Sequence, residues 1–350
     1  MMSKIRVMHL LKSNRYSGAE NVVCQIIEST RNQSNDYEMI YVSPKGPIEG
    51  ILEDKDINFF GLNNFTQKEI GRAIDLLNPD IIHAHDFSAS VRVSKYNRKI
   101  ISHLHNNPTW FSKLDYRTLI YTFSIHRFKG IIGVSRSIQN EYIFKNKLNK
   151  KFLVLPNVVD KTKVLNLANE ESYSSDLLFV GRLSREKDPL FFLQIVKKLV
   201  ESNPNIQAIM VGDGALLNEC EEYIVSNSLF NNVKMVGFEQ NPYKYMSKTK
   251  ILIMTSVYEG FGLVAIEAML LGKPVVCRPV GGLVDILDNE TGAFCTTIDE
   301  FVFTITQLLA NSSDIKLRET KAVERAQRYC DISSFQQTLD TLYKEILGLG

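Results

Sequence analysis

Two glutamates separated by a glycine-rich turn are the residues of this 350-residue chain whose types and spacing point most directly to chemistry. They are Glu259 and Glu267, in the sequence Glu-Gly-Phe-Gly-Leu-Val-Ala-Ile-Glu. If one helix held both, eight residues would separate them by about 12 Å along its axis. Glycosidases place their two carboxylates closer together, roughly 5–9.5 Å apart. The spacing therefore argues against hydrolysis between the pair and favours contacts with the two ends of one long ligand.

The turn between these glutamates is predicted to bind an anion. Gly260 and Gly262 permit close backbone approach, and a helix predicted from about Leu263 to Leu271 would leave unpaired N–H groups at its N-terminus. Such a terminus favours phosphate. A nucleotide sugar has ribose hydroxyls, a diphosphate and sugar hydroxyls along its length, and it fits this stretch. From this segment alone an alternative is equally open: Glu259 is an ordinary turn residue and Glu267 a solvated residue on a helix, neither of which binds a ligand.

The stretch also resembles the E-G-F-G-L-x-x-x-E signature of retaining GT-B glycosyltransferases of family 4 (glycosyl transferases group 1), of the surface-polysaccharide type. The resemblance implies an α/β protein with two Rossmann-like domains facing a central cleft. It implies retaining sugar transfer from a nucleotide-diphosphate sugar, without a metal or another cofactor. By this resemblance Glu259 is catalytic and holds the donor sugar together with Phe261 and Gly262. Gly262 and Leu263 then bind the diphosphate, and Glu267 binds the ribose.

A second motif, Gly-Arg-Leu-Ser-Arg-Glu-Lys-Asp-Pro, occupies residues 181–189. Asp188 can cap a helix and Pro189 suits its first position, so the preceding loop would carry Arg182 and Lys187 over the edge of a sheet. In the family, an Arg and a Lys at these positions grip the diphosphate. Arg offers a bidentate fork and Lys a compact charge, so the pair can replace a metal ion at the leaving group.

Three shorter segments also match the family. Ser17-Gly-Ala-Glu20 has the S-x-x-E form of a capping box. It also resembles the family's G-G-A-E loop, which implies that Gly18 approaches the donor diphosphate. The glycine turns at 211–214 and 236–238 match segments that border the nucleoside. We expect three of their residues to do so here: Gly212, Val236 and Phe238.

Histidines carry the main alternative chemistry. His83, His85, His103 and His105 form two His-x-His pairs after predicted strands. Residues two apart on a strand share a face, so the four could hold zinc in a metal-dependent hydrolase. The first three could instead be structural. His105 aligns with the family's histidine between donor sugar and acceptor, which makes it a catalytic candidate. A non-catalytic nucleotide-sugar binder is the remaining alternative, which the glutamate pair and the cations of residues 181–189 together disfavour.

Basic residues gather in the first half of the chain. Residues 92–151 contain 13 Lys and Arg but two acidic residues, with aromatic residues among them. This composition fits docking on an anionic membrane. A merely solvated basic face is the alternative, and no nucleic-acid module is visible. A glycan acceptor carried on polyprenyl diphosphate would suit such docking. We take a uridine-linked sugar as the default donor.

Alternating short apolar runs and amphipathic segments predict the parallel α/β architecture that must position these residues. The pattern starts at Ile5–Leu11 and restarts at Leu177–Val180. This predicts domains 1–160 and 161–332, a polar linker at 161–175, and a C-terminal helix at about 333–350 that packs back on the first domain. A missing signal peptide, the lack of an ~18-residue apolar run and five dispersed cysteines indicate a cytoplasmic protein, peripheral at the inner face of the membrane if the basic region binds lipid.

Overall fold

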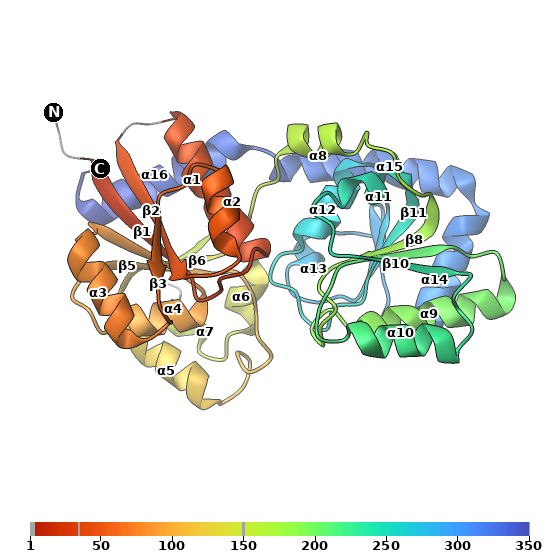
Figure 1. Ribbon diagram of the computed structural model, residues 1–350, viewed down its shortest axis with the longest axis horizontal. Helices are drawn as coiled ribbons and strands as arrows, with labels where there is room; N and C mark the ends of the chain where they lie inside the picture. The colour runs from red at the N-terminus through yellow and green to blue at the C-terminus, as the bar shows by residue number, and fades with distance from the viewer. Residues whose placement is uncertain (1–3, 34–35, 149–150, 350) are drawn as a thin grey trace. The chain divides into compact units, whose positions relative to one another are not determined.

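The computed structural model describes residues 4–33, 36–148 and 151–349, which form two compact units (Figure 1). One unit comprises Met1–Val158 together with Ile332–Gly350, and the other comprises Val159–Asp331. Lys150 of the basic stretch and Gly350 of the C-terminal segment lie outside the described residues. Each unit is a parallel sheet with helices packed on it, so the predicted parallel α/β architecture is confirmed.

The N-terminal unit contains a seven-stranded sheet in the order β3-β2-β1-β4-β5-β6-β7. Its strands are β1 Ile5–Leu10, β2 Tyr37–Pro44, β3 Phe59–Leu62, β4 Ile81–His85, β5 Lys99–Leu104, β6 Phe128–Gly133 and β7 Phe152–Val154. The central strands are buried almost throughout, as expected for parallel strands covered on both faces. The strand order reverses between β1 and β4, and at such a switch point the carboxyl ends of the strands leave room for a ligand.

Short helices connect these strands. They are α1 Gly18–Gln33, α2 Ile48–Asp54, α3 Gln67–Leu77, α4 Asp86–Val93, α5 Tyr116–Ser124, α6 Arg136–Glu141 and α7 Lys145–Leu148. A 3-10 turn, η1, follows α5 at Ile125–Arg127.

The last helix of the chain, α16 (Ile332–Leu347), packs on the N-terminal unit against α1 and β6. Its Gln336 side chain bonds to Thr30 at 2.9 Å, and Tyr37 donates to the carboxylate of Asp340 at 2.6 Å. Leu339 and Tyr343 are buried in the core of this unit. Residues from both ends of the sequence therefore build one hydrophobic core.

The C-terminal unit contains a six-stranded sheet in the order β10-β9-β8-β11-β12-β13. Its strands are β8 Ser175–Val180, β9 Ala208–Val211, β10 Val233–Gly237, β11 Thr249–Met254, β12 Val275–Cys277 and β13 Gly292–Phe294. Its helices are α8 Lys161–Leu167, α9 Pro189–Ser202, α10 Leu217–Ser226, α11 Tyr243–Lys248, α12 Leu263–Leu270, α13 Leu283–Ile286, α14 Ile298–Ala310 and α15 Ser312–Ala326, followed by the 3-10 turn η2 Gln327–Tyr329. Phe179, Phe192 and Phe301 lie in a continuous buried cluster between this sheet and its helices.

The prediction of a linker at 161–175 was wrong, because this stretch contains helix α8. The carboxylate of Asp160 caps the helix by accepting from the backbone N–H of Lys163 at 3.0 Å. Val164 is buried, and α8 packs against α11 and α12. Only one apolar side chain of this short helix is fully buried, so its sequence resembles a polar connection.

Candidate active site

The loop that carries Glu259 connects β11 to α12. It ends at Gly262, which is the N-cap of α12 and has a φ of 105°, a conformation that glycine adopts without strain. A second glycine turn packs directly against this loop: a Cβ on Gly281 would lie 1.5 Å from the carbonyl oxygen of Glu259. The N–H of Gly282 donates to that same oxygen at 3.1 Å. Gly281 and Gly282 thus fix the backbone position of Glu259.

The side chain of Glu259 forms an ion pair with Lys187. Its Oε2 atom lies 2.5 Å from Nζ of Lys187, and the hydroxyl of Ser256 donates to the same oxygen at 3.2 Å. Both partners are largely shielded, with 22% of the Lys187 side chain and 14% of the Glu259 side chain exposed. The structure therefore brings together two residues predicted from separate motifs.

Arg278, which sequence reasoning missed, connects the two loops that carry this ion pair. Its Nη1 donates to the carboxylate of Asp188 at 2.8 Å and to the carbonyl of Thr255 at 2.7 Å. Its guanidinium lies 3.9 Å from the ring centre of Phe191. The hydroxyl of Thr255 in turn donates to the carbonyl of Lys187 at 2.8 Å. The only signal in the sequence was the place of Arg278 directly after a predicted strand.

The motif at 181–189 has the predicted local structure. The carboxylate of Asp188 caps α9 by accepting from the N–H of Phe191, and Pro189 is the first helical residue. Arg182 lies in the preceding loop, 3.6 Å from Glu186, with 64% of its side chain exposed. The loop therefore presents one shielded cation, Lys187, and two exposed cations, Arg182 and Arg185.

The carboxyl ends of β8, β9 and β10 meet at tight glycine contacts. Gly212 has a φ of 144°, and a Cβ there would lie 1.9 Å from the carbonyl oxygen of Gly181. The N–H of Gly212 donates to the carbonyl of Gly237 at 2.8 Å. Val236 is half-buried, and Phe238, directly after β10, is 71% exposed. These turns lie at the sheet edge where parallel α/β proteins bind ligands.

Glu267 is a buried carboxylate on α12. It is 9% exposed, and the hydroxyl of Tyr243 donates to its Oε1 at 3.1 Å. Burial raises the pKa of its carboxyl to about 7, although Tyr243 and the nearby charge of Lys163 act in the opposite direction. The alternative that Glu267 is a solvated residue on the surface of a helix is therefore excluded. A raised pKa at a buried carboxylate is common among functional residues.

The remaining predicted residues of the C-terminal unit contribute backbone. The ring of Phe261 is buried and lies 5.6 Å from the ring of Tyr329, so only its backbone can face a ligand. Leu263 opens the first turn of α12. The N–H of Ala265 in this turn bonds to the carbonyl of Gly262 at 3.0 Å, whereas the N–H groups of Leu263 and Val264 come too early in the helix to reach a helix carbonyl. This helix terminus can therefore bind an anion.

In the N-terminal unit, Gly18 is the first residue of α1, which follows the carboxyl end of β1. A Cβ on Gly18 would contact nothing within 4 Å, so its surroundings are open. The hydroxyl of Ser17 donates to the carboxylate of Glu20. This bond differs from the capping box predicted here, in which each side chain bonds to a backbone N–H.

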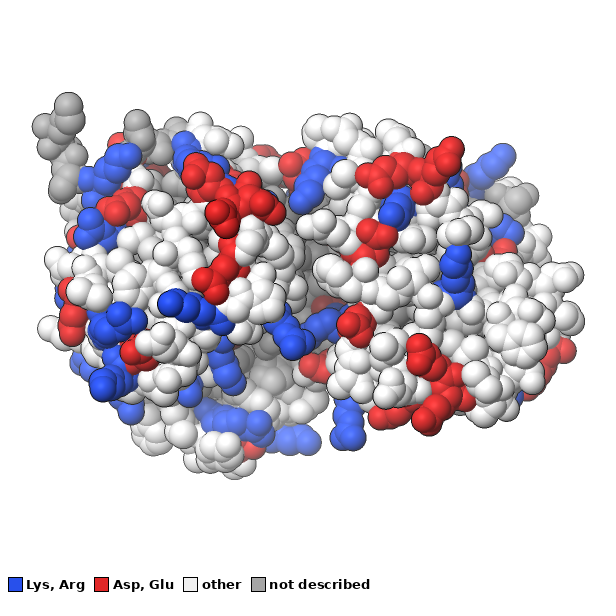
Figure 2. Space-filling model, in the orientation of Figure 1, with Lys and Arg blue, Asp and Glu red and all other residues white. Residues whose placement is uncertain are grey.

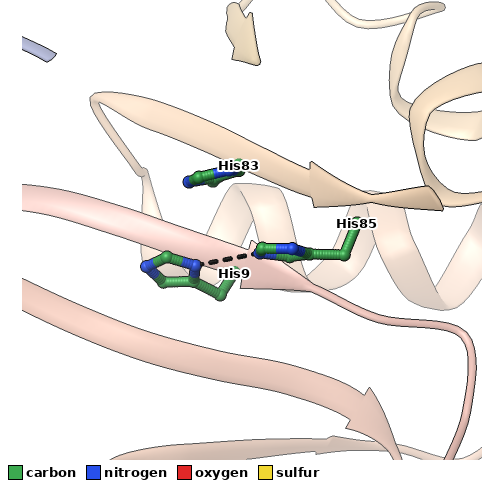
Figure 3. A group of neighbouring side chains, drawn as sticks. All are labelled: His9, His83 and His85. Carbon is green, nitrogen blue, oxygen red and sulfur yellow. Dashed lines mark hydrogen bonds between the residues drawn. The ribbon is translucent and has the colours of Figure 1, made fainter. Parts of the chain in front are cut away.

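Five histidines, four of them buried and His105 half-buried, form one group at three adjacent strands of the same unit. His9 belongs to β1, His83 and His85 to β4, and His103 to β5, and His105 follows β5 directly. Figure 3 shows how His9 and His85 face each other beside His83. Sequence reasoning missed His9; the available signal was a polar residue within the apolar run of the first strand.

Two chains of hydrogen bonds join these rings. In the first, Nδ1 of His9 lies 3.1 Å from Nε2 of His85, whose Nδ1 lies 2.8 Å from Nε2 of His105. In the second, the hydroxyl of Tyr343 lies 2.7 Å from Nδ1 of His83, whose Nε2 lies 3.1 Å from Nδ1 of His103. Burial lowers the pKa of His9 and His105 to about 3 and the pKa of the other three well below 6.5. All five rings are therefore neutral at pH 7.

Two sets of these histidines are close enough to hold a metal ion: His9 with His83 and His85, and His85 with His103 and His105. In each set the nitrogens lie within 4.8 Å of one another. Within each set, however, two nitrogens face each other at 2.8–3.1 Å as hydrogen-bond donor and acceptor. That contact occupies the lone pair that a metal would require, so the geometry fits ring-to-ring hydrogen bonds better than zinc.

Comparison with known families identifies the chain. Residues 16–163 match the family model described as Glycosyltransferase Family 4, and residues 164–328 match Glycosyl transferases group 1. The chain belongs to the group 1, family 4 glycosyltransferases. The two matches adjoin and divide at residue 163, close to the end of the N-terminal unit.

Relatives of this glycosyltransferase cover different shares of its length. An uncharacterized glycosyltransferase of Methanocaldococcus jannaschii is 28% identical over 234 residues, which are 59% of this chain and 57% of the relative. The UDP-Gal:alpha-D-GlcNAc-diphosphoundecaprenol alpha-1,3-galactosyltransferase of Escherichia coli is 22% identical over 89% of each chain. Anabaena HepE in complex with UDP-glucose has a TM-score of 0.83 at 22% identity, covering 98% of this chain and 99% of HepE. This likeness confirms the GT-B fold.

Proposed function

We propose that this protein is a retaining, metal-independent glycosyltransferase that transfers a sugar from a UDP-linked donor to a glycan on polyprenyl diphosphate. The ion pair of Lys187 and Glu259 carries the proposal, because it joins the predicted diphosphate grip to the predicted sugar-binding carboxylate. The donor and acceptor are those named for the Escherichia coli galactosyltransferase, and HepE was crystallised with UDP-glucose.

Departure of the nucleotide diphosphate is the step that the cations assist. Negative charge grows on the diphosphate as the glycosidic bond breaks, and fixed positive groups aimed at that charge lower the barrier. Lys187, Arg182 and the N–H groups at the start of α12 supply such groups. Their loops are held in place by backbone contacts and by Arg278 before the substrate binds. Positive charge from side chains and the helix terminus thereby replaces a metal ion.

Glu259 stabilises the developing positive charge of the donor sugar or holds its hydroxyls. Its Oε2 already accepts bonds from Lys187 and Ser256, which makes it a poor covalent nucleophile. The acceptor hydroxyl therefore attacks on the face that the diphosphate leaves, and the leaving phosphate takes the hydroxyl proton. The new bond keeps the configuration of the donor.

The nucleoside is bound at the edge of the C-terminal sheet. Glu267 holds the ribose hydroxyls, and Gly212, Val236 and Phe238 border the base and ribose. In the N-terminal unit, Gly18 approaches the diphosphate and His105 contacts the transferred sugar. Gly18 lies after the carboxyl end of β1 and His105 directly after that of β5, and β4 lies between these two strands in the sheet.

We further propose that the N-terminal unit docks on an anionic membrane through the surface around α5. This α5 surface exposes five large apolar or aromatic side chains: Leu114, Tyr116, Leu119, Ile120 and Phe123. Exposed basic side chains lie on it and in the segments that follow: Lys113, Arg117, Lys129, Lys145 and Lys147. Figure 2 shows Lys and Arg gathered in the region of α5, whereas acidic side chains lie over α1 and α2.

The composition of the α5 surface matches what an interfacial helix needs. Apolar side chains enter the headgroup boundary, while basic residues are attracted to anionic lipid. None of the described helices combines the length and apolar content needed to cross a bilayer. Docking of this kind would bring the unit to an acceptor anchored in the membrane.

A ligand panel followed by turnover tests the proposed activity. UDP-sugars should raise Tm, because a ligand that binds only the folded state stabilises it, whereas GDP- and ADP-sugars should have little effect. When a polyprenyl-diphosphate glycan is added, the protein should release UDP and form an α-linked product from an α-linked donor. This transfer should also occur in the presence of the metal chelator EDTA. Binding without turnover would instead indicate a nucleotide-sugar binder. Stoichiometric zinc with hydrolytic activity would indicate the hydrolase.

A further inference from the structure

The hydrogen-bonded chain His9–His85–His105 has two free ends that differ in their surroundings. Nε2 of His9 and Nδ1 of His105 are both buried and have no hydrogen-bond partner among the described residues. His9 is fully buried in the central strand β1, whereas His105 lies just past the carboxyl end of β5 and is half-buried. We propose that His9 and His85 act as positioning residues that fix the tautomer of His105, with the proton on Nδ1.

The number of protons restricts the chain to two arrangements. Each neutral imidazole carries one N–H and one bare nitrogen. The bonds at 3.1 Å and 2.8 Å each need one donor and one acceptor, so all three rings must point the same way. Either every ring donates toward His105, leaving N–H on its Nδ1, or every ring donates toward His9, leaving N–H on Nε2 of His9.

The surroundings of the two ends decide between these arrangements. A buried N–H without an acceptor is rare in proteins, because no hydrogen bond offsets the free energy lost when the group is removed from water. At His9 such an N–H would stay unpaired, because the ring is enclosed in the core. At His105 it lies at the ligand-binding edge of the sheet, where a substrate oxygen that displaces the covering atoms can accept from it. The arrangement that donates toward His105 is therefore favoured.

The consequence for catalysis rests on the proposed function. With its proton on Nδ1 and its Nε2 occupied by His85, His105 donates a hydrogen bond to an oxygen of the transferred sugar. In this tautomer neither nitrogen offers a free lone pair to the acceptor hydroxyl. His105 therefore binds sugar and is not the general base, which agrees with the leaving phosphate taking the proton.

The second chain supplies an internal control. His83 lies on the same strand as His85 and is also fully buried, yet it bonds to Tyr343 and His103. Replacing His83 removes a buried histidine from the same stack without breaking the chain to His105. Effects of general destabilisation and effects of the tautomer can thus be separated.

Nitrogen NMR of protein labelled at its six histidines reads the tautomer directly. Spectra that correlate each ring nitrogen with the ring carbon-bound protons distinguish N–H from bare nitrogen. We expect His105 to carry its proton on Nδ1 and to have a bare Nε2, with His85 in the same tautomer. A proton on Nε2 of His105 in the wild-type protein would overturn the proposal. So would stoichiometric zinc in the purified protein, because ligating nitrogens cannot carry these protons.

Variants of His9 test the positioning role. His9→Leu removes the first donor, so His105 should lose its uniform Nδ1–H state, and kcat should fall about 10- to 100-fold, as for other outer-shell partners. His9→Asn keeps a donor near the position of Nδ1 and should restore both. His83→Leu should leave the tautomer of His105 unchanged. An unaltered His105 spectrum in His9→Leu would refute the coupling, and because NMR needs no turnover, this outcome is independent of whether the proposed transfer is found.

Discussion

The ammonium group of Lys187 lies 2.5 Å from the carboxylate of Glu259, although 72 residues separate the two in the sequence. This contact joins the loop before α9 to the loop before α12. Each loop is also fixed by backbone bonds, for example from the N–H of Val257 to the carbonyl of Glu186 at 2.8 Å. The positive charge of Lys187 and the negative charge of Glu259 are therefore set at a fixed separation.

Lys187→Ala should lower kcat by about 10²–10³-fold, the range for loss of one preorganised donor to developing charge. Glu259→Gln should lower kcat as well, because the amide cannot stabilise positive charge on the sugar. Steady-state kinetics with the UDP-sugar found in the ligand panel measure both. Lys198→Ala, on the exposed side of α9, is the matched control and should keep wild-type rates. Wild-type kcat in Lys187→Ala would mean that the site is wrongly assigned.

Arg278→Met should loosen the two loops while leaving the chemical groups of the site in place. The guanidinium bonds both Asp188 and Thr255, and methionine keeps the bulk near Phe191 but makes neither bond. We expect kcat to fall about 10- to 100-fold, by analogy with outer-shell partners elsewhere. Thermal unfolding should show that the variant is folded. Equal kcat in the variant and the wild type would show that Arg278 does not position Lys187.

Affinity for UDP should fall as the pH drops below about 7 because of Glu267. Burial raises the pKa of this carboxyl to about 7, and ribose hydroxyls bond best to the ionised form. Protonation therefore competes with binding, by up to about tenfold per pH unit below the pKa. Calorimetric titration between pH 5.5 and 8 measures the effect. The Glu267→Gln variant should bind UDP more weakly. Its affinity should then vary with pH only through the titration of UDP itself.

Stability should fall as the pH drops from about 6.5 toward 5. The five clustered histidines have a folded-state pKa far below the unfolded value of 6.5, so in this window the unfolded chain binds protons that the folded protein does not. Each of these histidines can lower the free energy of unfolding by up to about 1.4 kcal/mol per pH unit in this window. Glu267 and Asp86 act in the opposite direction, since burial raises their carboxyl pKa to about 7 and about 6.

Urea unfolding at pH 7.5 and pH 5.5 measures the net change. Because five histidines oppose two carboxyl groups, the free energy of unfolding should be lower at pH 5.5. His83→Leu should reduce the difference between the two pH values. A free energy of unfolding that rises on acidification would contradict the neutral state of the cluster.

The α5 surface should bind vesicles that contain anionic phospholipid and should not bind neutral ones. Replacing Leu119 and Phe123 with serine should weaken this binding, since both are exposed and apolar. High salt should weaken it too, because it screens the basic residues. Phe303 is also an exposed phenylalanine and lies in the C-terminal unit, so Phe303→Ser is the control and should bind like the wild type. Vesicle binding that does not depend on salt would refute the assignment of the α5 surface as the docking site. So would equal binding by the Leu119/Phe123 variant and the Phe303→Ser control.

The sequence predicted the features that rest on local patterns. The strand at Leu177–Val180, the cap at Asp188 and the glycine turn before α12 follow from neighbouring residues. The short strands β3 and β13 were not anticipated, because four- and three-residue edge strands carry little periodicity. His9 and Arg278 were missed for another reason. Their hydrogen-bond partners are distant in sequence; His85, for example, is 76 residues from His9. A local sequence pattern cannot show which remote residue a buried polar side chain will bond.

The path of the chain through α16 has a consequence for synthesis. Residues 1–158 are translated before residues 159–331, yet Leu339 and Tyr343 of α16 fill part of the core of the first unit. Domains generally fold as units in the order in which they are translated. Here the first unit must wait, with the site for α16 uncovered, until the whole second unit has been made. Of the two units, the one that is translated first is thus the last to finish folding.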